Sequence, residues 1–251
     1  MGSVRVGVGP IKGDIMNGIM GDKGQRDTFT AVPYPKDMRA FARYAHGHTL
    51  LKIAVSGAAA TGYCGLDVFE KAKEVGREIA RQGAAIVTGA TTGFAFYATM
   101  GAKEEGGFSI GFSPAATERE HVEVYKLPLD YMDVIVYTGF GYSGRDLLMV
   151  RSSDAVIIGC GRIGTINEFA VAFEDRRPIG IVEGSWDTDE ILQNIITTAH
   201  RANPRITINS NAKSLVEGVI TQVKKDKQEL NLVYRSRDGV GGTGRNSEVI
   251  L

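Results

Sequence analysis

Short apolar runs that end at a glycine recur along this chain, and segments with helical spacing follow them. The first run is LLKIAVSG at residues 50–57, and residues 66–83 then repeat apolar side chains every three or four positions. The same pattern of an apolar run that ends at a glycine recurs in AAIVTG at 84–89 and in DAVIIGCG at 154–161. Apolar runs without alternation are typical of parallel strands buried on both faces. The chain is therefore predicted to be α/β, a single-domain doubly wound Rossmann-like parallel sheet with helices on both faces.

Further segments fit the same architecture. A helix over residues 141–153 is expected to carry Arg145 near its start, and amphipathic helices are predicted over 188–201 and 212–229. In such a fold, ligands bind at the carboxyl ends of the strands. Four further strands are predicted from FSIGFSP, VEVYKLP, DVIVYTG and PIGIVEG, at residues 108–114, 122–128, 133–139 and 178–184.

The chain is divided into three parts. Residues 1–49 are glycine-rich with little periodicity and are predicted to be an irregular N-terminal arm with a short helix. Residues 50–230 are predicted to form a Rossmann-like nucleotide-binding domain, and residues 231–251 are expected to be a loose C-terminal tail.

Charge and hydropathy restrict the partners. Lysine plus arginine equals aspartate plus glutamate at 29 each, so no global field favours nucleic acid or an anionic membrane. No apolar run approaches the ~18 residues of a transmembrane helix. The start MGSVRV lacks a secretory apolar region and the Ser or Thr of a myristoylation signal. A cytoplasmic protein with a small-molecule ligand is expected.

The cysteines and histidines give no metal-binding pattern. Cys64 and Cys160 have no CxxC or Cys/His spacing, so both are expected to be reduced, without a structural metal or a cofactor. Surface positions are expected for His46, His48, His121 and His200.

The decapeptide GCGRIGTINE, residues 159–168, supports two interpretations. In the first, Thr165 and Glu168 form a capping box and the glycines merely make a turn. In the second, backbone N–H groups at the start of the helix bind a phosphate. A P-loop is excluded because no GxxxxGK[ST] occurs, and a NAD-dependent oxidoreductase would need a ribose carboxylate that cannot be assigned.

Residues 144–182 resemble the LOG (Lonely Guy) family, once called lysine decarboxylase-like, whose hallmarks are RKxxM and PGGxGTxxE. The V-R-S-x-D-A segment at 150–155 is more similar to the molybdenum-cofactor carrier branch of that superfamily. The motif positions fall in register on Arg145, Met149, Gly161, Gly164, Thr165 and Glu168.

The resemblance implies site residues and a function. It implies catalytic roles for Arg145, which could clamp a phosphate or sugar, and for Glu168, which could act at a ribosyl centre. The implied activity is hydrolysis of the N-glycosidic bond of a nucleoside 5′-monophosphate or related phosphoribosyl compound, by a homodimer. The alternative is a nucleotide or molybdopterin carrier without turnover. The phosphate- or nucleotide-binding residues would be Gly57, Gly89, Gly93, Gly161, Arg162, Gly164 and Thr165.

Three positions depart from the family pattern. Asp146 replaces the motif lysine beside Arg145, which reverses the charge there. Cys160 and Arg162 replace the proline and the second glycine. Arg162 either blocks the anion-binding turn or adds a cation to it, and Asp146 favours the carrier alternative.

Overall fold

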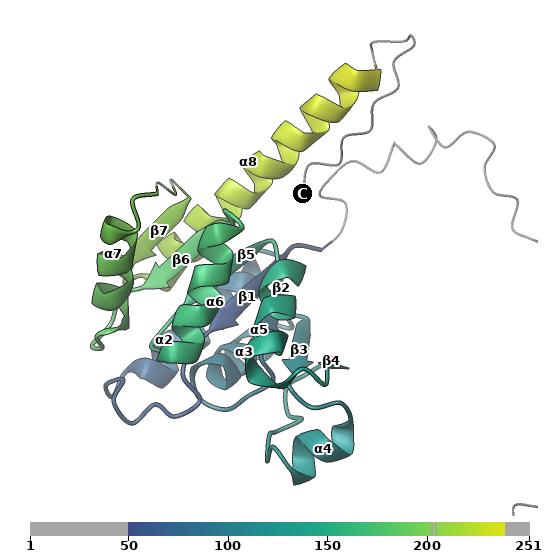
Figure 1. Cartoon of the computed structure of the whole chain (residues 1–251), viewed down its shortest axis with the longest axis vertical. Helices are drawn as coiled ribbons and strands as arrows, with labels where there is room; N and C mark the ends of the chain where they lie inside the picture. Colours follow the sequence, from purple (N-terminus) through teal and green to yellow (C-terminus); the bar gives the residue numbers. More distant parts are fainter. Residues whose placement is uncertain (1–49, 202, 204, 239–251) are drawn as a thin grey trace, which may run out of the picture. The chain divides into compact units, whose positions relative to one another are not determined.

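A computed structural model describes residues 50–201, 203 and 205–238. The predicted arm at 1–49 and the last 13 residues, 239–251, lie outside this range. The described part contains one parallel sheet in the order β4-β3-β2-β1-β5-β6-β7 (Figure 1). The strands are β1 (Lys52–Ser56), β2 (Ala85–Thr88), β3 (Ser109–Ser113), β4 (Val134–Tyr137), β5 (Ala155–Ile158), β6 (Ile179–Val182) and β7 (Ile206–Asn209).

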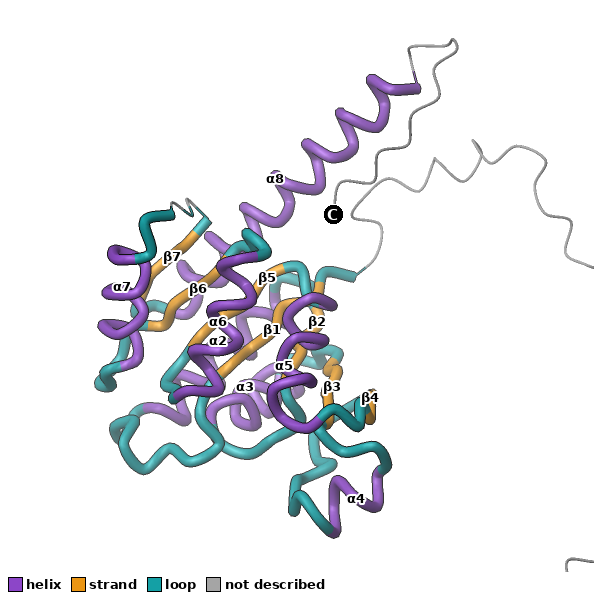
Figure 2. Tube along the Cα trace, viewed as in Figure 1, coloured by secondary structure: helices purple, strands orange, loops and turns teal. Residues whose placement is uncertain are grey.

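Helices cover both faces of the sheet, which confirms the predicted doubly wound architecture (Figure 2). One apolar core packs α2, α3 and α8 against the sheet, and the other packs α5, α6 and α7 against the opposite face. The helices are α2 (Val68–Arg81), α3 (Phe94–Glu104), α4 (Glu118–Glu123), α5 (Gly141–Ser152), α6 (Ile163–Glu174), α7 (Thr188–Thr198) and α8 (Ala212–Asp238).

The strand order predicts a crevice beyond the carboxyl ends of β1 and β5. β1 pairs with β2 on one side and with β5 on the other, so the connections that follow β1 and β5 lead to opposite halves of the sheet. Diverging loops at such a switch point leave room for a ligand beyond the carboxyl ends of the strands. Of the residues that the structure describes, no helix is long and apolar enough to cross a bilayer.

Three local assignments differ from the sequence prediction. The predicted strand VEVYKLP is wrong: its first two residues end α4, and residues 124–128 form a turn and a loop. Thr117 caps the start of this helix, where its side chain accepts from the Glu120 N–H at 3.1 Å. The four-residue edge strand β7 had no strand prediction. Helix α8 continues to Asp238, across the predicted start of the tail at residue 231.

The prediction of reduced cysteines is also wrong. Cys64 and Cys160 form a disulfide between fully buried residues, with their Cα atoms 5.8 Å apart. The bond forms because the loop after β1 folds back on the turn after β5, where the Ala58 N–H donates to the Cys160 carbonyl at 2.7 Å. A separation of 96 residues hides this proximity in the sequence.

His121 is buried rather than at the surface. Its Nδ1 lies 2.8 Å from Ser113 Oγ, and its Nε2 lies 3.0 Å from the Pro128 carbonyl oxygen. Ser113 ends β3 and Pro128 follows α4, so this histidine ties the α4 segment to the sheet.

Candidate functional site

A cavity of about 250 Å³ lies at the carboxyl ends of β1, β2 and β5. Its wall includes the turn Ser56–Ala59 after β1, Gly89 and Thr91 after β2, and the first turns of α5 and α6. This is the crevice that the strand order predicts. Four charged side chains reach it: Arg145, Asp146, Arg162 and Glu168.

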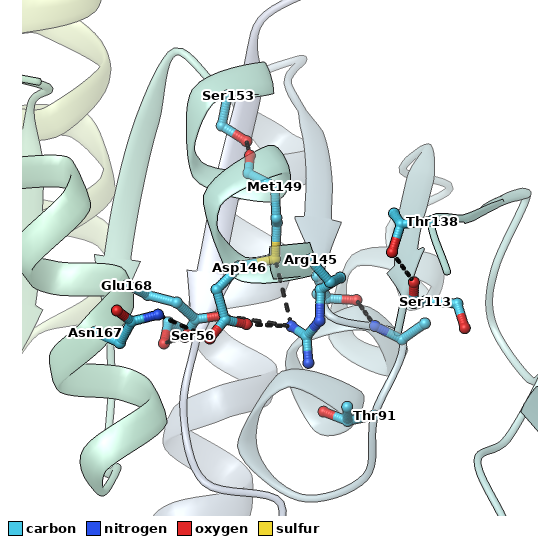
Figure 3. A network of polar contacts seen from close by, with 12 residues as sticks. Ser56, Thr91, Ser113, Thr138, Arg145, Asp146, Met149, Ser153, Asn167 and Glu168 are labelled. Carbon is cyan, nitrogen blue, oxygen red and sulfur yellow. Dashed lines mark hydrogen bonds and ion pairs between the residues drawn. The ribbon is translucent and has the colours of Figure 1, made fainter. Parts of the chain in front are cut away.

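Arg145 projects from α5 into a buried ion cluster (Figure 3). Only 5% of the residue is exposed, and its Nη1 lies 3.2 Å from Asp146 Oδ1 and 3.4 Å from Glu168 Oε1. Arg145 is therefore a buried residue of the cavity and not a surface residue at the start of α5. A Cβ at Gly89 would overlap the guanidinium group, so only glycine leaves room for Arg145 here. Within the described residues, Arg145 Nε has no hydrogen-bond partner.

Glu168 enters the cluster from α6. The Ser56 hydroxyl, at the end of β1, donates to its Oε2, and Arg145 donates to its Oε1. Burial, together with the neighbouring Asp146 carboxylate, raises the pKa of Glu168 to about 8, although Arg145 acts in the opposite direction. The protonated form of Glu168 is therefore favoured relative to that of an exposed glutamate.

Asp146 is the second buried carboxyl group of the cluster. Burial raises its pKa, while Arg145 and a 3.2 Å hydrogen bond from Asn167 Nδ2 favour the ionised form. With the ionised form of Glu168 disfavoured, Asp146 opposes the charge of Arg145 at 3.2 Å. The cluster is then close to neutral and adds little attraction for an anion.

The structure excludes the capping-box interpretation of the GCGRIGTINE turn. Helix α6 begins at Ile163, its N-cap residue is Arg162, and no side chain caps it. Glu168 instead points to Ser56 and Arg145 (Figure 3). The exposed N-terminus of α6 keeps N–H groups that have no intrahelical partner.

Arg162 has a different environment from Arg145. It is exposed at the cavity, and its guanidinium carbon lies 5.6 Å from the centre of the Tyr63 ring. It makes no ion pair with any described residue. Arg162 is thus the cation at this cavity whose charge no carboxylate within the described range neutralises.

Seven of the nine predicted site residues line the cavity: Gly57, Gly89, Arg145, Arg162, Gly164, Thr165 and Glu168. Gly93 and Gly161 do not. Gly93 has a φ of 73° and lies against the Ala58 carbonyl, so it shapes the turn behind the cavity. The Gly161 N–H donates to Thr188 Oγ1 at 2.8 Å and is already paired.

Sequence reasoning missed several residues of the site. Ser56 and Asn167 bind the carboxyl groups, and Tyr142 lines the cavity. The position of Ser56 at the end of the first strand was a usable signal, since such ends face the ligand in this fold. Tyr142 lies three residues before Arg145, on the same side of α5.

Residues 50–216 match the model of the SLOG cluster4 family. An uncharacterized protein of Archaeoglobus fulgidus is 31% identical over 130 residues, which are 52% of this chain and 78% of that protein. The molybdenum cofactor binding protein of Rippkaea orientalis is 27% identical, with a TM-score of 0.56 over 71% of this chain and 98% of its own. The molybdenum cofactor carrier protein of Chlamydomonas reinhardtii shares the fold at 24% identity, with a TM-score of 0.55 over 70% of this chain and 99% of its own.

Proposed function

We propose that this chain, which belongs to the SLOG cluster4 family, binds a phosphorylated nucleotide-like ligand in the cavity beyond the carboxyl ends of β1 and β5. The ligand class includes nucleoside 5′-monophosphates and molybdopterin, which both join a phosphate to a planar heterocycle. The observation that carries the proposal is the position of Arg162, which pairs with no carboxylate of the described residues. It lies in the cavity at the switch point, beside the N-terminus of α6, which has no side-chain cap.

The phosphate is assigned to the start of α6. Gly164 and Thr165 line the cavity within the first turn, where free N–H groups and the helix dipole favour an anion. A Cβ at Gly164 would meet no described atom within 4 Å, so space remains in front of this turn. Arg162 can add a charge-assisted hydrogen bond to the same phosphate.

The buried cluster suits the uncharged part of such a ligand. Asp146 can accept hydrogen bonds from sugar or ring N–H and O–H groups. A carrier without turnover agrees with this arrangement, because Ser56 and Arg145 already hold both oxygens of Glu168. The 27% identity to a molybdenum cofactor binding protein supports the same choice.

Hydrolysis of an N-glycosidic bond is the second candidate. It is favoured by the raised pKa of Glu168, because a carboxyl group that is protonated at neutral pH can protonate a departing base. Asp146 would then be the ionised partner of that acid.

One calorimetric and chromatographic experiment separates these candidates. The protein is titrated with AMP, GMP, ribose 5-phosphate and isolated molybdenum cofactor, and each nucleotide mixture is then assayed for free base. Binding without release of base supports a carrier, and release that Glu168→Gln abolishes supports the hydrolase. If none of the four ligands binds, the proposed function is wrong.

We further propose that the protein is a homodimer. Apolar side chains are exposed on the edge strand β4 and on α5: Val134, Val136, Leu147 and Leu148 are each 37–45% exposed. Val134 and Val136 pair with Ile110 and Phe112 of β3, whose side chains pack toward the face that α5 and α6 cover. A second copy would bury this surface, as two-fold interfaces commonly do.

A further inference from the structure

Tyr142 lies at the mouth of the cavity, where two neighbouring side chains contact its ring. It is in the first turn of α5, lines the cavity and is 51% exposed. The Arg145 guanidinium carbon lies 5.8 Å from the centre of its ring. The half-buried Tyr125 meets the ring edge-on, with the centres 5.6 Å apart and the planes at 79°. These contacts fix the direction of the ring and leave about half of the residue open.

The size of the cavity limits what it can enclose. Its volume of about 250 Å³ is below the roughly 300–1,000 Å³ of most small-molecule sites. The phosphate and the adjoining sugar-like part fill such a space, with the phosphate at the start of α6. The planar heterocycle then reaches the mouth, where Tyr142 is the aromatic residue in the cavity wall.

We propose that Tyr142 determines specificity by stacking on the planar heterocycle of the phosphorylated ligand. The proposal rests on the proposed function and adds the residue that recognises the ring. Aromatic side chains bind purines and pterins through their faces, with little demand on the pattern of hydrogen-bonding groups. Tyr142 therefore selects ligands that carry a planar ring over those that carry only a phosphorylated sugar.

Neighbouring aromatic residues do not meet the same conditions. Phe140 is 68% exposed and immediately precedes α5, but it does not line the cavity. Tyr63 already faces Arg162 and is also outside the cavity wall. Phe140 is consequently a matched control, since it is an exposed aromatic residue two positions away.

The test compares ligands that differ only in the ring. Calorimetry measures the Kd of GMP, AMP and ribose 5-phosphate for the wild type and for Tyr142→Ala, Tyr142→Phe and Phe140→Ala. Tyr142→Ala should weaken the binding of the nucleotide by tenfold or more and that of ribose 5-phosphate by less than twofold. Tyr142→Phe and Phe140→Ala should retain the wild-type affinities. Circular dichroism checks that each variant is folded.

The outcomes keep the two proposals apart. If the wild type binds a nucleotide no better than ribose 5-phosphate, or if Tyr142→Ala binds it like the wild type, the stacking proposal is overturned while the proposed function stands. Equal losses for the nucleotide and for ribose 5-phosphate also overturn it, because Tyr142 would then act through Arg145. If the wild type binds none of the three ligands, the stacking proposal fails; whether the proposed function fails too depends on the molybdenum cofactor in the preceding titration.

Discussion

Glu168 illustrates how a single residue can serve a site through its protonation state. It is buried beside Asp146, so its ionised form is disfavoured. The charges of Arg145 and Asp146, 3.2 Å apart, then oppose one another. The phosphate of the proposed ligand is then expected to bind to Arg162 and to the start of α6.

The raised pKa of Glu168 predicts that stability falls as pH rises. An unfolded glutamate titrates near ~4.3, whereas the folded group titrates at about 8. Between these values the folded state holds more protons, so the free energy of unfolding decreases with rising pH. Glu168→Gln keeps the shape of the side chain and removes its titratable group. The stability of this variant should therefore decline less than that of the wild type between pH 5 and 8. Denaturant unfolding measures the stability of the wild type and of the variant at each pH. Parallel pH profiles of the two proteins would contradict the raised pKa of Glu168.

Arg145→Ala should weaken ligand binding by about 1.5–3 kcal/mol, because it removes the charged contacts that hold Asp146 and Glu168 at the cavity. The control is Arg151→Ala on the same helix, because the Arg151 side chain is 61% exposed and pairs with Asp175 away from the cavity. Calorimetry with GMP compares the two variants. Equal affinities of the two variants would show that Arg145 has no part in the site.

Sequence reasoning reached Arg145 and Glu168 because their spacing matches a recognisable motif. It could not decide whether Glu168 caps its helix or turns inward, since both depend on where α6 begins. The start at Ile163 and the hydroxyl of Ser56, 112 residues earlier, settle that choice. Long-range contacts of this kind leave no local pattern.

At the scale of elements, the disulfide joins the two loops that frame the cavity. Cys64 belongs to the loop after β1, and Cys160 directly precedes the turn that carries Arg162. Disulfides are rare in reducing compartments, so this bond stands against the predicted cytoplasmic location. That location stays a prediction.

Reduction of Cys64–Cys160 should destabilise the protein by up to about 4–5 kcal/mol, the loop-closure value for a span near 100 residues. Thermal unfolding with and without a phosphine reductant measures the change in Tm. The control is Cys64→Ser/Cys160→Ser, whose Tm should not respond to the reductant. Two free thiols in unreduced, denatured protein would contradict the bond.

Local patterns predicted most elements because apolar runs and helical spacing are strong along this chain. They failed at VEVYKLP, where the β-branched residues Val122 and Val124 favour a strand, although α4 continues to Glu123 and a turn follows it. They also missed β7, because four half-buried residues at the edge of a sheet give too short a signal.

At the scale of the whole molecule, the proposed dimer has a direct test. Light scattering should give twice the chain mass of 27.0 kDa at micromolar concentration. Val136→Glu places a charge on the exposed face of β4 and should shift the protein to the monomer. The control is Leu230→Glu, on an exposed position of α8. A wild type that stays at the mass of one chain would refute the dimer.

The central claim is that the cavity beyond the carboxyl ends of β1 and β5 binds the phosphate of a nucleotide-like ligand at the start of α6. A crystal structure of the protein with bound GMP or molybdenum cofactor tests it most directly. The phosphate should accept hydrogen bonds from the N–H groups of Gly164 and Thr165 and from the Arg162 guanidinium group. A phosphate bound only by the turn at Gly57–Ala59, with the start of α6 unoccupied, would contradict the account.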